Sequence, residues 1–83
     1  MRHSSSSALV FDQGRQVLLR VGGKFFELSQ ETLRAVLGLP PGPAGLGITI
    51  DRDRFRFEFT DQEPIEMTAD GLKRRLAKEL TAK

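Results

Sequence analysis

The sequence LGITIDRDRFRFEF, residues 46–59, changes the parity of its apolar positions halfway along. The apolar residues are even-numbered in residues 46–50 and odd-numbered in residues 55–59. In one continuous strand the two sets would point to opposite faces, because side chains alternate along a strand. A tight turn at Arg52-Asp53 brings both sets to one face. The sequence therefore predicts two antiparallel strands joined in a hairpin.

The N-terminal half predicts a three-stranded meander. Residues 8–12, 15–21 and 24–28 are rich in strand-forming residues, and Gln13-Gly14 and Gly22-Gly23 separate them as tight-turn candidates. Both turns assign the same residues to one apolar face, and a slip of one residue in either would destroy that face. These residues are Ala8, Val10, Val17, Leu19, Val21, Phe26 and Leu28.

The opposite face of this meander is also apolar. The residues on it are Leu9, Phe11, Leu18 and Phe25, beside Arg20 and Glu27. A sheet that is apolar on both faces is usually covered on both faces. A chain of 83 residues with two predicted helices leaves part of six strands uncovered. We therefore expect the four apolar residues to form a dimer face between two copies of the chain.

A capped helix is expected after each set of three strands. Ser29 and Thr68 are the predicted N-caps, and Gly38 ends the first helix. The inward stripes are Leu33, Val36 and Leu37 in the first helix, and Leu72, Leu76 and Leu80 in the second. Three of the four prolines lie in residues 39–45, which predicts a connector there, and Pro64 marks a short edge strand at residues 64–67.

The two halves echo one another at a spacing of 39 residues. Residues 9–37 align with residues 48–76 without a gap, and five of the 29 pairs are identical. Duplication of one unit explains the echo, and so does convergence of two capped helices that each follow hairpins. Either origin predicts an α+β fold of two tandem strand–strand–strand–helix units, with antiparallel sheets related by a pseudo-twofold axis. The predicted units are residues 8–38 and 46–82 of a single domain, 8–83, after a disordered tail at residues 1–7.

The residues needed for common catalytic and metal sites are scarce. The chain has no cysteine, and its one histidine, His3, lies in the polar tail with Ser4–Ser7. We therefore expect no catalytic residue, no cofactor and no metal site. The one carboxylate set that we consider for a cation is Asp51, Asp53 and Asp61. The positive charges of the neighbouring arginines disfavour cation binding there. The lack of cysteine also fits a reducing compartment, so we expect a cytoplasmic protein with no membrane partner.

Three function classes remain. The first is a non-catalytic binding and assembly module that acts through protein–protein contacts as a homodimer. The second is a nucleic-acid-binding regulator. Its candidate contacts are Arg15, Arg54, Arg56, Lys73, Arg74, Arg75 and Lys78. Residues 72–83 carry a net charge of +4, which favours this class or the ordinary preference of helix C-termini for cations. The third is a small-ligand binder or minor enzyme, with its site between the units near Glu27 and Glu66.

Overall fold

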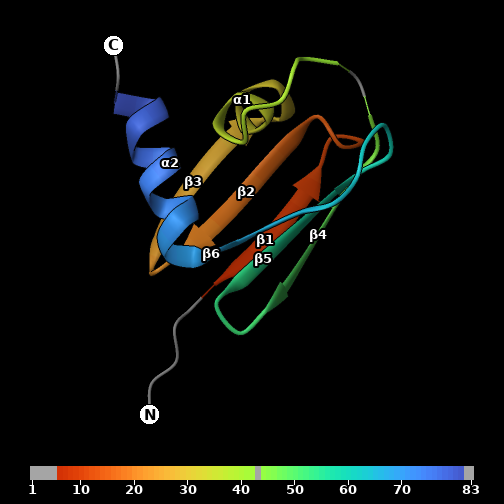
Figure 1. Cartoon of the computed structure of the whole chain (residues 1–83). Coiled ribbons are helices and arrows are strands. Elements are labelled where there is room, and N and C mark those ends of the chain that lie inside the picture. The colour runs from red at the N-terminus through yellow and green to blue at the C-terminus, as the bar shows by residue number, and fades with distance from the viewer. Residues whose placement is uncertain (1–5, 43, 82–83) are drawn as a thin grey trace.

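The computed structural model describes residues 6–42 and 44–81 and confirms the predicted element order. Of the predicted tail, residues 1–5 lie outside the described residues and Ser7 begins the first strand. The fold is α+β, with two antiparallel three-stranded sheets and two helices (Figure 1). The elements are β1 (Ser7–Phe11), β2 (Gln16–Val21), β3 (Lys24–Ser29), α1 (Gln30–Val36), β4 (Leu46–Asp51), β5 (Arg54–Phe59), β6 (Ile65–Thr68) and α2 (Ala69–Thr81).

The strand registers are those that the apolar pattern predicts. In the first sheet, Val17 on β2 pairs with Val10 on β1 and with Leu28 on β3. In the second sheet, Phe57 on β5 pairs with Ile48 on β4 and with Ile65 on β6. Each sheet keeps the strand order of the sequence, so β6 is an edge strand as expected. The hairpin at residues 46–59 is thereby confirmed.

The caps and the helix stripes also agree with the sequence. The Ser29 hydroxyl accepts a hydrogen bond from the Thr32 amide at 3.2 Å, and the Thr68 hydroxyl accepts one from the Gly71 amide at 3.2 Å. The predicted stripe residues of both helices are buried, except Leu80, which is exposed near the end of α2. The predicted stripe of α2 is therefore one turn shorter than the sequence indicates.

The turn between β1 and β2 is longer than predicted. The ladder ends at the pair Phe11 and Gln16, so residues 12–15 form the turn. Asp12 and Gln13 both have positive φ, at 56° and 55°. The Gln30 side chain holds this turn, because its Nε2 donates to the Gly14 carbonyl at 2.6 Å. A contact from α1, which local sequence does not show, therefore sets the shape of this hairpin.

Arg52 occupies a strained position in the turn between β4 and β5, because its φ is 61°. Only this first central residue of the turn is left-handed, a conformation that glycine adopts without steric cost. We expect Arg52→Gly to stabilise the fold by about 0.5 kcal/mol, since the relieved strain exceeds the entropy gained by the unfolded chain. Urea denaturation measures this change. Asp53→Gly, at the neighbouring position, is the matched control and should destabilise; equal losses in both variants would contradict the assigned strain.

The two units are not related by one constant spacing. Measured by place in the sheets, Val10 corresponds to Ile50, forty positions later, and Val17 to Phe55, thirty-eight positions later. Leu28 corresponds to Met67, thirty-nine positions later. The gap-free alignment therefore holds for the third strands and the helices. In the hairpins it aligns residues that face inward in one unit with residues that face outward in the other. As a result, the outer faces of the two sheets carry unrelated residues.

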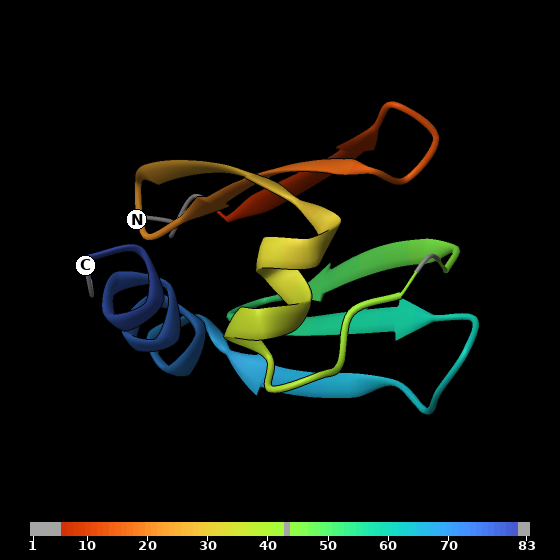
Figure 2. The same ribbon diagram turned by 90° about the horizontal axis from the view of Figure 1, so that it is seen from above.

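The core lies between the two sheets and under the helices. Figure 2 shows the sheets as two layers with α1 between them and α2 at one end. β1 lies against β4, while α2 contacts β6 and also β2 of the other sheet. The fully buried side chains come from both sheets and both helices: Val17, Leu19, Val21, Leu33, Phe55, Phe57, Leu72 and Leu76. Neither unit encloses this core by itself, because both sheets and both helices contribute side chains to it.

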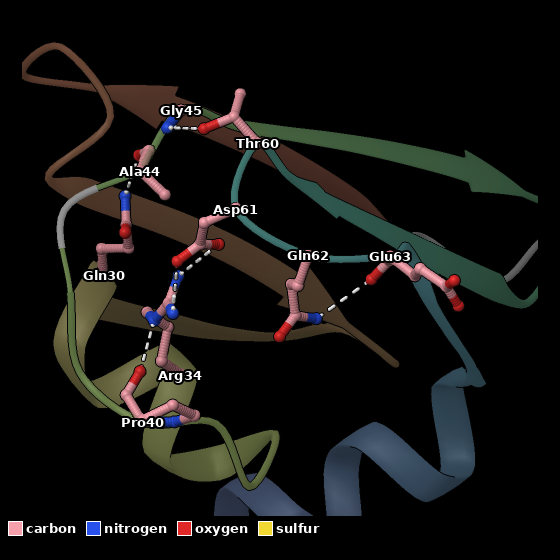
Figure 3. A network of polar contacts seen from close by, with 9 residues as sticks. All are labelled: Gln30, Arg34, Pro40, Ala44, Gly45, Thr60, Asp61, Gln62 and Glu63. Atoms are coloured by element: carbon pink, nitrogen blue, oxygen red, sulfur yellow. Dashed lines mark hydrogen bonds and ion pairs between the residues drawn. The ribbon is translucent and has the colours of Figure 1, made fainter.

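A buried arginine joins the two units. Arg34 on α1 is only 2% exposed, and its Nη2 lies 2.9 Å from Oδ2 of Asp61, which follows β5. Its Nε donates to the Pro40 carbonyl at 2.8 Å, and its guanidinium stacks 4.9 Å from the ring centre of Phe59. Figure 3 shows the contacts of Arg34 with Pro40 in the connector and with Asp61 in the loop after β5. The arginine therefore fixes the first unit against the second.

The ion pair with Arg34 lowers the pKa of the Asp61 carboxyl, chiefly through the hydrogen bonds that the guanidinium donates. A carboxyl whose pKa is lower in the folded state stabilises the fold above its unfolded pKa of about 3.9. That contribution is lost as the pH falls through the lower, folded-state pKa. We expect wild type to be more stable than Asp61→Asn at neutral pH, and the difference to shrink below about pH 4.

Urea denaturation of both proteins at a series of pH values tests this expectation. The other carboxyl groups titrate in both proteins, so the difference between them isolates Asp61. A difference that stays constant from neutral to acidic pH would show that the ion pair does not contribute.

Candidate functional site

The outer face of the first sheet is the main candidate site. Leu9 is 57% exposed, Phe11 36% and Phe25 64%, while Leu18 is partly buried between them. Within residues 6–42 and 44–81, three of the four exposed large apolar side chains therefore lie on this one face. The sequence predicted these four residues, which we call the apolar patch. Their exposure arises because strand alternation turns their neighbours Val10, Val17 and Phe26 inward.

Two opposite charges flank the apolar patch. The Arg20 guanidinium lies 5.3 Å from the ring centre of Phe25, its cross-strand partner. Glu27 is exposed and pairs through the backbone with Leu18. Among the described residues neither Arg20 nor Glu27 forms an ion pair. Arg20 Nε is also buried and lacks a hydrogen-bond partner within the described chain.

The outer face of the second sheet is polar instead. Arg56 lies 2.8 Å from Glu58 and 2.6 Å from Glu66, and Arg54 lies 3.8 Å from Glu66. These hydrogen bonds, first of all the one to Glu58, raise the pKa of the Arg56 guanidinium. Both arginines that we proposed for nucleic-acid contact on this sheet are therefore paired with carboxylates. Their charge is largely neutralised by neighbours on the same face.

The other predicted nucleic-acid contacts lie on different elements. Arg15 is exposed in the turn between β1 and β2, away from the strands that carry Arg54 and Arg56. On α2, Arg75 donates from Nη1 to the Val36 carbonyl at 3.3 Å, which ties it to α1. The remaining three, Lys73, Arg74 and Lys78, are exposed on α2. The seven cations therefore do not form one continuous surface along a single element.

The predicted ligand site near Glu27 and Glu66 is wrong. The sheets pack through their inner faces, whereas Glu27 and Glu66 lie on the outer faces of different sheets. The two carboxylates occupy equivalent places in the two halves of the sequence, 39 residues apart, and each precedes a helix. They cannot act together on one substrate between the units.

The carboxylates proposed for a cation are also separated. Asp51 ends β4 and Asp53 lies in the turn between β4 and β5, whereas Asp61 follows the far end of β5 and pairs with Arg34. Across residues 6–42 and 44–81 there is no group of three or more histidine, aspartate or glutamate side chains that could hold a metal ion. His3 lies outside the described residues.

An open pocket of about 440 Å³ lies beside the turn between β1 and β2. Its lining combines this turn with the start of α1 and the connector: Gln13, Gly14, Arg15, Gln16, Ser29, Gln30, Glu31, Gly42 and Ala44. The Gln30 amide nitrogen donates to the Gly14 and Ala44 carbonyls, at 2.6 and 3.0 Å. Gln30 Oε1 is buried without a partner in the described chain, and having no accessible surface it is out of reach of a ligand in the pocket. Gln30 therefore joins the turn between β1 and β2 to the connector.

Comparisons with protein-family models, with curated proteins and with solved structures return no match. None of the helices in the described part of the chain combines the length and the apolar character needed to cross a membrane. The function must therefore be inferred from the chain's own surfaces. Of these, the apolar patch has the composition least expected for a surface in contact with water.

Proposed function

We propose that the protein is a non-catalytic binding and assembly module that forms a homodimer through the outer face of β1–β3. The observation that carries this proposal is the gathering of Leu9, Phe11 and Phe25, at 57%, 36% and 64% exposure, around Leu18 on one sheet face. Contiguous exposed apolar surface of this kind marks interaction sites. A cytoplasmic location belongs to the proposal and is supported by the lack of cysteine.

The patch suits a weak or transient dimer. With strands about 4.8 Å apart and a rise of about 3.4 Å per residue, three strands of five residues cover roughly 14 by 17 Å. Flanking side chains enlarge this footprint, yet it stays below the ~800 Å² per partner of a standard interface. We therefore expect a dissociation constant on the order of 10 µM, about 7 kcal/mol of binding free energy.

The contrast between the two outer faces limits the assembly to two chains. The second sheet presents Arg54, Arg56, Glu58 and Glu66 where the first presents the apolar patch. When one self-complementary surface pairs with the same surface of a second copy, both surfaces are used and the assembly is complete as a twofold dimer. A dimer is therefore expected rather than a filament.

The test is sedimentation equilibrium of wild type and Leu18→Arg over a range from low to high micromolar concentration. Leu18 lies at the centre of the patch, so we expect the arginine to weaken dimerisation at least tenfold because it places a charge inside the contact. Thr49→Arg, which adds the same charge to the exposed face of β4, is the matched control and should dimerise as wild type does. A wild-type protein that remains a monomer at tens of micromolar would contradict the proposal.

Nucleic-acid binding through α2 is the second candidate. Lys73, Arg74 and Lys78 are exposed, and in the described part of the chain none of them forms an ion pair. Such cations bind phosphates weakly and with steep salt dependence. Fluorescence anisotropy with a labelled single-stranded oligonucleotide at low salt tests this. Binding that is lost in Arg74→Ala/Lys78→Ala would support the α2 site, and no binding at low salt would exclude it.

A further inference from the structure

The outer face of the first sheet has a regular arrangement that its register defines. The cross-strand partners form three rows: Ser7–Arg20–Phe25, Leu9–Leu18–Glu27 and Phe11–Gln16–Ser29. One diagonal of this array is the apolar line Phe11–Leu18–Phe25. Arg20 and Leu9 lie on one side of this line, and Glu27 and Gln16 lie on the other side.

We propose that a second copy of this chain packs on the patch about a twofold axis that runs along the line Phe11–Leu18–Phe25. This inference rests on the proposed function and adds the arrangement of the dimer. Rotation about that axis exchanges the two sides of the line. Arg20 of each copy then faces the partner's Glu27, and Leu18 and Phe25 each face the same residue of the partner. The Arg20–Glu27 pair occurs twice and each self-pair on the axis occurs once, as twofold symmetry requires.

The other simple axes in the plane of the face create unfavourable contacts. An axis along the strands places Arg20 against the partner's Arg20. An axis across the strands places Glu27 against the partner's Glu27. An axis along the other diagonal places Arg20 against the partner's Leu9 and leaves both charges unpaired. Like charges that meet in a contact, or charges buried there without a partner, cost free energy. Only the axis along the apolar line pairs opposite charges.

The state of Arg20 within one chain supports this arrangement. Its guanidinium stacks over Phe25 at 5.3 Å and forms no ion pair among the described residues. The exposed Glu27 likewise has no ion pair within that part of the chain. Both groups are therefore available to a partner. The stacked ring also holds the guanidinium at the face, which reduces the entropy lost when the pair forms.

The axis also predicts how the strands cross. Cross-strand neighbours are about 4.8 Å apart and alternate residues about 6.7 Å apart, so the diagonal lies roughly 35° from the strand direction. The strands of the two copies would then cross at roughly 70°, close to the orthogonal class of sheet packing. Aligned packing of the two sheets would require a different axis.

Charge reversal tests the arrangement. Arg20→Glu sets two carboxylates against one another in a homodimer, and Glu27→Arg sets two guanidinium groups against one another. We expect each variant to dimerise at least tenfold more weakly than wild type. An equimolar mixture restores both opposite-charge pairs, so it should form a heterodimer at least tenfold tighter than either variant alone. The double variant Arg20→Glu/Glu27→Arg should recover the homodimer. Sedimentation equilibrium measures the homodimers, native mass spectrometry measures the mixture, and circular dichroism confirms that each variant is folded.

The outcomes separate this inference from the proposed function. If wild type dimerises, Leu18→Arg dissociates it and the charge reversals change nothing, the axis is wrong and the patch remains the dimer face. The same conclusion follows if both single variants weaken the dimer and neither the mixture nor the double variant restores it. If wild type does not dimerise, the proposed function itself fails.

Discussion

Replacing Phe57 with alanine is expected to destabilise the fold by about 3–5 kcal/mol. Phe57 is fully buried on the central strand β5, between Ile48 and Ile65, and its ring lies 6.1 Å from that of Phe55. The substitution leaves a cavity between the sheets that the neighbouring strands cannot close. A domain of this size has a total stability of only about 5–10 kcal/mol, so this loss removes a large part of the stability of the fold.

Urea denaturation at low micromolar concentration measures this loss. Phe25→Ala is the matched control, because Phe25 is 64% exposed on the outer face and its truncation opens no cavity. The control should change the free energy of unfolding of the monomer by less than about 1 kcal/mol. Equal losses in the two variants would show that the inner and outer faces of the sheets have been assigned incorrectly.

Replacing Arg34 with methionine should destabilise the fold by about 2–4 kcal/mol, since a buried arginine that satisfies several partners is lost. Methionine keeps much of the length of the side chain and removes its charge. The Pro40 carbonyl and Asp61 then lose the donors that lie 2.8 and 2.9 Å away, and Phe59 loses the stacked guanidinium. The same contacts join α1 to the loop after β5, so the units should separate more readily.

Arg56→Met is the control for this second prediction. Arg56 forms ion pairs of similar length, at 2.8 and 2.6 Å, but its side chain is 43% exposed. Exposed ion pairs of this kind contribute about 0–1 kcal/mol, so the control should lose much less stability than Arg34→Met. Thermal and urea denaturation measure both variants. If Arg34→Met and Arg56→Met lost the same stability, the burial of Arg34 would not be what stabilises the junction.

Element order and register could be predicted because the parity of apolar positions fixes them. The switch within residues 46–59 requires a hairpin at Arg52-Asp53, and the structure has it. The four-residue turn at residues 12–15 could not be predicted in the same way. It depends on the Gln30 side chain, sixteen residues after Gly14, and such contacts leave no local pattern.

The junction between the units was also beyond sequence reasoning. Arg34 lies beside the apolar stripe of α1, where an arginine ordinarily reaches solvent. Its burial depends on Asp61, 27 residues later, and on the path of the connector through Pro40. A charged residue next to an inward stripe, with a carboxylate near the end of a later strand, was the only signal, and many unrelated pairs share it.

The apolar patch could be predicted because alternation assigns Leu9, Phe11, Leu18 and Phe25 to the outer face once the turns are placed. The ligand site near Glu27 and Glu66 failed because equivalent places in a repeat need not converge in space. Charge alone identifies the cations predicted for nucleic-acid contact, whereas the ion pairs of Arg54 and Arg56 with Glu66 depend on the pairing of β5 with β6. The same register places Arg20 and Glu27 beside the patch.

Sedimentation equilibrium of the wild-type chain tests the central claim most directly. At tens of micromolar, the outer face of β1–β3 should bring two chains together, and the measured mass should approach twice 9.3 kDa. The mass should return toward 9.3 kDa on dilution or in Leu18→Arg. A mass of 9.3 kDa at every concentration would mean that no second copy covers the patch.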